Sequence, residues 1–184
     1  MSIEAGPAPP DTTPEALLAR LDELGLKTET RHHAPMFTVA EAKDLRGDIP
    51  GAHCKSLFLR DKKGMQWLVV TLEDQPIDLK ALAGLIGAGR LSFASPRRLL
   101  ACLGVAPGSV TPFALINRQN PGEDGGKLRV VLDADMMDAG LVNYHPLTNR
   151  ATTTMSPADL LRFIDDCGHE PMIVKLPPAS PASD

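Results

Sequence analysis

The 184-residue sequence has few cysteines, few aromatic residues and no long apolar run, and each shortage excludes a class of protein. Cys54, Cys102 and Cys167 are widely spaced, without a CxxC pair or a histidine at ligand spacing. We therefore expect neither a disulfide framework nor a zinc site, and a reducing compartment. No apolar run approaches the roughly 20 residues that cross a bilayer, and the first residues, MSIEAGPAPPDTTP, lack the pattern of a secretory signal. We expect a cytoplasmic protein that does not engage membranes.

Phosphate-binding loops and excess positive charge are also missing. The sequence has no GxGxxG or GxxxxGK[ST] loop, so a dinucleotide or P-loop nucleotide function has no support and no cofactor is expected. Lysine and arginine number 19 against 23 aspartates and glutamates, a formal net charge of −4. Proteins that bind long duplexes usually present a basic face, so a duplex-DNA reader is not expected. Any nucleic-acid partner should be held at a small, local contact.

The residues that are present fit one folded domain. Domains cluster at roughly 100 to 200 residues, and the hydrophobic fraction of 43% is typical of a globular chain. Residues 1–12 and 177–184 are rich in proline and small residues, which predicts disordered tails around a domain at 13–176.

Capping and turn signals predict mixed secondary structure. Five segments begin with a residue that can cap a helix, continue with apolar residues at helical spacing and end at a glycine. They predict helices at 13–25, 38–47, 78–89, 95–104 and 156–168. Residues 55–72 predict a hairpin with its turn at Asp61–Gly64, and further strands are predicted at 90–94, 113–117, 127–133, 140–144, 150–155 and 171–176. Because this order lacks a regular β-α-β alternation, we expect a single α+β domain with a mixed, largely antiparallel sheet flanked by helices.

One stretch fits neither a surface loop nor a core strand. NYHPLTNRATTT, residues 143–154, combines a histidine with amide and hydroxyl side chains and hardly any charge. Such a segment could line a small polar pocket.

Three segments carry a resemblance to a known family. They are HCKSLFLRDKKGMQWLVV, RLSFASPRRLLACLGVAPGSVTPFALIN and VNYHPLTNRATTTMSPADLLRFIDDCGHEP. In this order they resemble the YbaK-like aminoacyl-tRNA deacylases, most closely the free-standing prolyl-tRNA editing proteins, from about Leu17 to Leu176. The resemblance implies the YbaK/prolyl-tRNA synthetase editing-domain fold. It also implies a trans-editing hydrolase that removes alanine from mischarged Ala-tRNA(Pro), with the tRNA 3′ acceptor end as partner and prolyl-tRNA synthetase as a candidate partner.

The resemblance also implies site residues. Lys55, followed by Ser56, matches the lysine implicated in binding the tRNA 3′ end. Its ammonium group suits a phosphate or an oxyanion better than general-base work. The loop that borders the aminoacyl pocket matches Gly108, Ser109, Val110, Thr111 and Pro112.

The opposite side of the predicted pocket matches Asn143, His145, Asn149 and Thr152. Only His145 among them has a free pKa, ~6.5, that permits proton transfer near neutrality, and a structural hydrogen-bonding role fits it equally. We therefore predict Lys55 and His145 as the catalytic residues and the others as substrate-binding residues.

Covalent catalysis is an alternative, because Cys54 and Ser56 flank Lys55. No GxSxG elbow occurs and no acid is placed to orient His145. The family instead implies attack by water, assisted by the 2′-hydroxyl of the substrate. Since a pocket gains roughly 1 kcal/mol for each buried methylene, alanine can be selected over proline only by excluding the larger group.

Other functions stay open from the sequence. A Cys-tRNA(Pro) deacylase of the same family and a non-catalytic nucleic-acid-binding or regulatory protein are the principal alternatives. A basic rim around the pocket mouth could meet tRNA phosphates; its candidates are Arg60, Lys62, Lys63, Arg90, Arg97 and Arg98.

Overall fold

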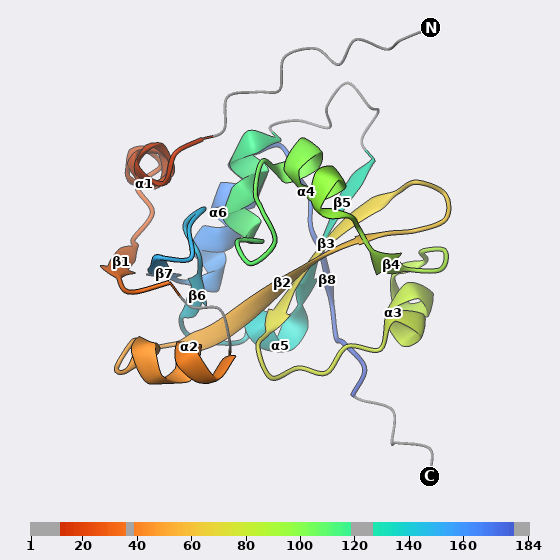
Figure 1. The fold of residues 1–184 in the computed structure, drawn as a ribbon, viewed down its shortest axis with the longest axis horizontal. Coiled ribbons are helices and arrows are strands. Elements are labelled where there is room, and N and C mark those ends of the chain that lie inside the picture. The colour runs from red at the N-terminus through yellow and green to blue at the C-terminus, as the bar shows by residue number, and fades with distance from the viewer. Residues whose placement is uncertain (1–11, 36–38, 119–126, 179–184) are drawn as a thin grey trace, which may run out of the picture.

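The fold is organised around one mixed sheet. The computed structural model describes residues 12–35, 39–118 and 127–178. In these residues the sheet has eight strands in the order β1-β7-β6-β2-β3-β5-β8, with β4 paired to β2 (Figure 1). The strands are β1 (Glu29–His32), β2 (Ala52–Arg60), β3 (Gln66–Leu72), β4 (Ser92–Phe93), β5 (Leu128–Asp133), β6 (Val142–Tyr144), β7 (Ala151–Met155) and β8 (Met172–Val174).

Strand direction confirms the predicted class. The pairs β1–β7, β6–β7, β2–β3 and β2–β4 are antiparallel, whereas β2–β6, β3–β5 and β5–β8 are parallel. The sheet is therefore mixed, with more antiparallel than parallel pairs. The flanking helices are α1 (Pro14–Glu23), α2 (Val39–Arg46), α3 (Leu79–Ile86), α4 (Pro96–Leu103), the 3₁₀ helix η1 (Pro112–Asn117), α5 (Ala134–Met137) and α6 (Pro157–Asp166).

The predicted helix starts are formed by the predicted caps. The hydroxyls of Thr13, Ser95 and Ser156 each accept a backbone N–H three residues on, at 3.1 to 3.2 Å, and a proline follows each cap. The predicted cap at Thr38 lies outside the described residues, as do nearly all residues of the predicted tails 1–12 and 177–184. None of the described helices is long and apolar enough to span a membrane.

The strand predicted at 113–117 was wrong. Residues Pro112–Asn117 form η1 instead, with Thr111 accepting the Phe113 N–H at 3.3 Å and Pro112 at the first helical position. Proline fixes φ near the helical value, and a short apolar run has no period that separates a strand from a buried helix. The sequence reading also missed β1 and α5, because β1 is a short, polar and mostly exposed strand and α5 has only four residues.

Apolar layers cover both faces of the sheet. One core cluster joins the sheet to α1, α4, η1 and α6, and Phe58 and Val70 belong to it. The other joins it to α3, and Leu59 and Val69 belong to that one. Since successive residues of a strand point to opposite faces, β2 contributes to both layers.

Phe113 lies at the centre of the larger cluster. It is fully buried, and its ring meets Tyr144 and Phe163 edge-on at centroid distances of 5.8 and 5.5 Å. We expect Phe113→Ala to lower the free energy of unfolding by about 3–5 kcal/mol, measured by urea denaturation. The matched control is Leu100→Ala on α4, because Leu100 is 55% exposed. A Phe113→Ala loss as small as that of the control would contradict the central role of this ring.

Candidate active site

β2 has an open edge in its middle. On the side away from β3, it pairs with β6 at Ala52 and His53 and with β4 at Leu59 and Arg60. Within the described ranges, no strand borders residues 54–58 on that side.

Backbone groups of Ser56 face this opening. The N–H of Glu73 on the β3 side donates to His53 O, and the N–H of Ala94 on the β4 side donates to Phe58 O. Because backbone groups alternate between the two edges of a strand, odd-numbered residues of β2 face β3 and even-numbered ones face away. The N–H and C=O of Ser56 are therefore directed into the open edge.

Polar side chains from four chain segments share one face beside this edge. The β2–β6 register, continued by two residues, sets His145 level with Lys55. The β6–β7 register, continued by one residue, sets Thr152 opposite His145, and Nε2 of His33 lies 2.8 Å from Oγ1 of Thr152. We call His33, Thr152, His145 and Lys55 the polar row. Pairing of β2 with β6 stops at His53 and Asn143, so the two strands separate between Lys55 and His145.

Asn143 holds the strands at the point where they part. Its amide nitrogen donates to Pro50 O at 2.9 Å and Ala52 O at 3.2 Å, and its Oδ1 accepts from the Thr154 hydroxyl at 2.5 Å. Asn143 as a whole is only 2% exposed. Asn143 was predicted to bind substrate, and the structure shows its amide joining β6 to β7 and to the start of β2.

The two histidines of the polar row have defined hydrogen-bond directions. Nδ1 of His145 lies 3.2 Å from Ala151 O, and Nδ1 of His33 lies 2.9 Å from Ala34 O. A carbonyl oxygen only accepts, so both rings carry a proton on Nδ1. In the neutral state Nε2 of His33 then accepts from the Thr152 hydroxyl, and Nε2 of His145 is its basic nitrogen.

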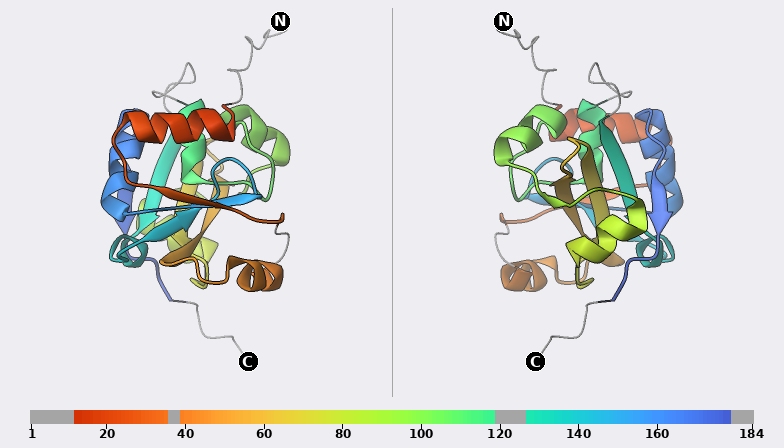
Figure 2. Two further views of the ribbon diagram at one scale, coloured as in Figure 1. Left: turned by 90° about the vertical axis from the view of Figure 1, so that its left-hand side faces the viewer. Right: turned by 90° about the vertical axis from the view of Figure 1, so that its right-hand side faces the viewer.

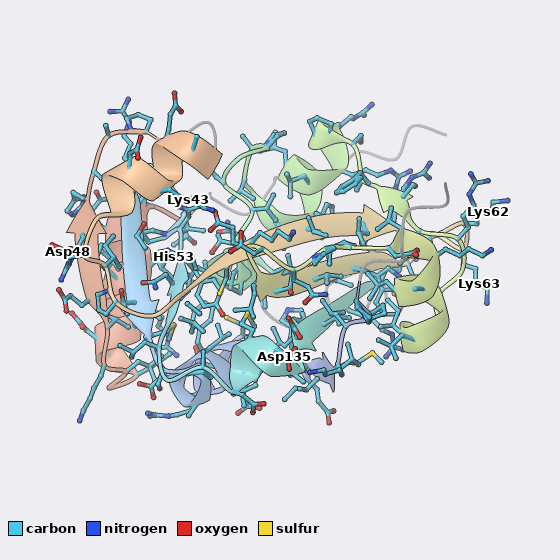
Figure 3. The ribbon with its side chains drawn as sticks, turned by 90° about the horizontal axis from the view of Figure 1, so that it is seen from below. Lys43, Asp48, His53, Lys62, Lys63 and Asp135 are labelled. Atoms are coloured by element: carbon cyan, nitrogen blue, oxygen red, sulfur yellow. The ribbon has the colours of Figure 1, made fainter. Side chains whose placement is uncertain are left out.

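Lys55 is half-buried beside a cavity. Its ammonium group donates to Gln75 O at 2.6 Å. Burial lowers the pKa of Lys55, against the opposing attraction of Asp74 and Glu73. A cavity of about 590 Å³ lies next to it, lined by Lys43, Gly47, Ala52, His53, Leu72, Glu73, Asp74 and Gln75. Figure 3 shows Lys43 on α2 and His53 near the start of β2 on the same side of the molecule.

The other predicted residues lie on the far side of β2. Ser56 shares its face of β2 with Cys54 and Phe58, which face the larger core cluster, and Val110 packs against the same cluster. Gly108 is exposed with a φ of +89°, which favours glycine, while Thr111 and Pro112 are buried. Ser109 donates its N–H to Ala106 O at 3.1 Å within this turn.

The β6–β7 connection and the segment between α4 and η1 nevertheless lie close to each other. Asn149 is half-buried in the β6–β7 connection, and Leu147 of that connection packs against the same cluster as Val110. In Figures 1 and 2 the β6–β7 connection lies beside the segment between α4 and η1. The continued strand registers thus assign Lys55, His145 and Thr152 to one face, and Ser56 and the Gly108–Pro112 loop lie toward the other.

Comparisons with known proteins identify the family of the chain. The family model described as the aminoacyl-tRNA editing domain matches residues 33–163. The prolyl-tRNA synthetase associated domain-containing protein 1 of Bos taurus is 40% identical over 164 residues, covering 86% of this chain and 92% of the relative. The prolyl-tRNA editing protein ProX of Acetoanaerobium sticklandii is 36% identical over 156 residues, with 84% and 92% covered.

A solved structure shows the same fold. A proposed trans-editing enzyme for prolyl-tRNA synthetase superposes with a TM-score of 0.65 at 24% identity, covering 94% of this chain and 98% of the other. The chain belongs to the aminoacyl-tRNA editing domain family. It is accordingly a hydrolase that deacylates aminoacyl-tRNA.

His33 is a candidate site residue that the sequence analysis did not predict. It contacts Thr152 directly and stands at the first residue matched by the family model. The only local signal is the pair of histidines in RHHAP, residues 31–35, at the end of a strand without apolar alternation.

The first prediction from the site concerns Asn143. Asn143→Asp places a carboxylate oxygen where the amide nitrogen donates to Pro50 O and Ala52 O, so attraction becomes repulsion at both contacts. We expect the free energy of unfolding to fall by at least about 2 kcal/mol, measured by thermal and urea denaturation. Asn149→Asp, the same change in a half-buried connection, is the control for stability. Equal effects of the two substitutions would disprove a clamp at Asn143.

The second prediction concerns Cys54. Burial raises the pKa of its thiol to about 11, so little thiolate exists at neutral pH. We expect iodoacetamide to alkylate Cys54 ~300-fold more slowly at pH 7.5 than a free cysteine of ordinary pKa, with the rate rising up to about pH 11. Mass spectrometry of the Cys54 peptide measures this, with the urea-unfolded chain as control. A half-maximal rate near pH 8 in the folded protein would revive Cys54 as a nucleophile.

Proposed function

We propose that this protein is a trans-editing hydrolase that deacylates mischarged Ala-tRNA(Pro). The observation that carries the proposal is the polar row beside the open edge of β2, where a cation, an imidazole and a hydroxyl come from different segments of the chain. The names of relatives such as the prolyl-tRNA editing protein ProX support tRNA(Pro) as the substrate. The tRNA 3′ acceptor end is the partner, and prolyl-tRNA synthetase is a candidate protein partner, as the name of the Bos taurus relative suggests.

The reaction is hydrolysis of the aminoacyl ester by water. The water oxygen attacks the ester carbonyl carbon, the bond to the terminal ribose oxygen breaks, and that oxygen takes up a proton as alanine leaves. The charged Lys55 stabilises the negative charge that develops on the carbonyl oxygen. The Ser56 N–H, directed into the open edge, is a second donor for this charge. His145 accepts or orients the proton of water or of the substrate 2′-hydroxyl through Nε2.

The positions of Cys54 and Ser56 are consistent with water, and not a side chain, as the nucleophile. Cys54 has a raised pKa, and the side chains of Cys54 and Ser56 point to the face opposite Lys55 and His145. Neither side chain is therefore oriented to form an acyl intermediate with His145 as its base. Both observations favour direct attack by water over covalent catalysis.

Selection of alanine rests on exclusion close to the ester. The cavity of about 590 Å³ beside Lys55 is several times larger than an alanyl group, so its volume cannot reject proline. Rejection must come from side chains in contact with the acyl group, where overpacking costs ~1–3 kcal/mol. Cys-tRNA(Pro) is the second candidate substrate, since the same groups would act on its ester and cysteine is also smaller than proline.

The test compares acyl groups of increasing size on one tRNA. We expect rapid release from Ala-tRNA(Pro) and slow release from Pro-tRNA(Pro), with 2-aminobutyryl-tRNA(Pro) intermediate, in single-turnover assays. Selective release of cysteine would change the substrate and keep the mechanism. Comparable rates for alanine and proline would disprove size exclusion, and no release from any substrate would favour a non-catalytic binding protein.

Lys55→Met tests the chemistry at the site. We expect the rate of alanine release to fall ~100-fold or more, because the charge that stabilises the oxyanion is removed. Burial lowers the pKa of Lys55 in the folded protein. At neutral pH, where Lys55 is charged, this burial therefore reduces the free energy of unfolding. The neutral variant should therefore melt at the same temperature or higher, by calorimetry. Lys80→Met, an exposed lysine on α3, is the control. A large loss of melting temperature would reassign Lys55 to a structural role.

A further inference from the structure

Six basic side chains gather around the short strand β4. Arg60 pairs with Ser92 in β4. The backbone N–H of Gly89 bonds the Asp61 carboxylate, which holds the α3–β4 connection against the β2–β3 turn. All six side chains are exposed, and we call them the β4 basic surface: Arg60, Lys62, Lys63, Arg90, Arg97 and Arg98. Figure 3 shows Lys62 and Lys63 at the far end of the β2–β3 hairpin from His53 and α2.

Ion pairing distinguishes this surface from five cations elsewhere in the described residues. In the described ranges no carboxylate forms an ion pair with any of the six side chains. Five cations elsewhere form ion pairs with carboxylates: Arg20, Arg31, Lys43, Arg162 and Lys175. Clustered like charges repel one another, and an anion bound across them relieves that repulsion. In a chain with a formal net charge of −4, such a cluster points to a polyanionic partner.

An exposed aromatic ring lies within this surface. Phe93 is 63% exposed and pairs directly with Leu59. Lys55 and Leu59 point to the same face of β2 because they are four residues apart, so Phe93 shares the face of Lys55. Four residues of strand span about 13 Å. Stacked nucleotides rise about 3.4 Å each, so this span corresponds to about four nucleotides.

That length matches the end of a tRNA. The unpaired 3′ end of a tRNA has about four nucleotides, so an aminoacyl ester at Lys55 puts the junction with the acceptor stem near Phe93. Basic side chains then lie where the phosphates of the duplex begin. An aromatic ring can stack on any base without reading its sequence.

We propose that the β4 basic surface docks the acceptor stem of the substrate tRNA, with its cations on the phosphates and Phe93 stacked on a base at the junction of stem and single strand. This inference rests on the proposed function, because it takes the ester at Lys55 as its origin. It adds a second contact that binds tRNA away from the chemistry. The surface therefore increases the affinity for whole tRNA and leaves the hydrolytic step unchanged.

The test compares whole Ala-tRNA(Pro) with the alanyl ester of adenosine, which lacks the stem. We expect Arg97→Glu/Arg98→Glu and Lys62→Glu/Lys63→Glu each to lower kcat/KM for Ala-tRNA(Pro) by about 10- to 100-fold, chiefly through KM. Turnover of alanyl-adenosine should stay unchanged. The slope of log kcat/KM against log salt concentration should fall by about one for each lost phosphate contact. Lys27→Glu/Lys80→Glu, with the same change in net charge at exposed sites elsewhere, is the control.

Phe93 provides an independent variant. We expect Phe93→Ala and Phe93→Leu both to weaken binding of uncharged tRNA(Pro) by about 5- to 100-fold in fluorescence anisotropy, because neither side chain stacks on a base. Full binding by Phe93→Leu would remove stacking from the proposal.

The outcomes separate this surface from the proposed function. Unchanged kcat/KM for Ala-tRNA(Pro) in both charge-reversed doubles, with alanyl-adenosine still hydrolysed, would overturn the surface and keep the function. Equal losses on both substrates would also overturn it, since the residues would then act in the chemistry. If the wild type hydrolyses neither substrate, the proposed function fails, and anisotropy with uncharged tRNA still decides whether the surface binds RNA.

Discussion

The separation of β2 from β6 is the constraint on which the candidate site depends. Asn143 ties three backbone or side-chain partners together immediately before the strands part, so the sheet is firm at the point where the opening begins. If pairing continued beyond that fixed point, β6 would lie against β2 and close the edge that Ser56 faces. The predicted catalytic pair, Lys55 and His145, stands just beyond the last paired residues. The polar residues of segment 143–154 thus have two roles. Asn143 is buried and holds the strands together, whereas His145 and Thr152 belong to the polar row beside the opening.

Lys55 illustrates the conflict between stability and function in this site. Its ammonium group is partly removed from water and meets a neutral carbonyl, Gln75 O, at close range. A protein selected only for stability would place an apolar residue or a paired ion there. The backbone is also strained near the site, because Leu147, two residues after His145, adopts a φ of 64°. Non-glycine residues rarely occupy that region, and such outliers concentrate at functional sites.

Sequence patterns were sufficient where local chemistry decides structure. Ser-Pro and Thr-Pro starts and the turn at Asp61–Gly64 act within a few residues, and all appear in the fold. Pairing between distant segments carries no local signal, which is why β1 and the contact of His33 with Thr152 were missed. The strand alternation that sends Ser56 away from Lys55 was available in the sequence. It became informative only when the core clusters showed which face each residue occupies.

The open edge of β2 has a consequence for how this chain behaves in a crowded solution. Unpaired strand edges recruit strands from other molecules, which is a common route to aggregation. Here the stretch that no strand borders is short, residues 54–58, and Phe58 O already accepts the Ala94 N–H; the stretch is stopped at one end by β6 and at the other by β4. An incoming β-strand would have to end abruptly at both sides, and the exposed Lys62 and Lys63 of the β2–β3 turn repel the same residues of another copy. The gap can therefore stay open to a small ligand while remaining a poor template for self-association.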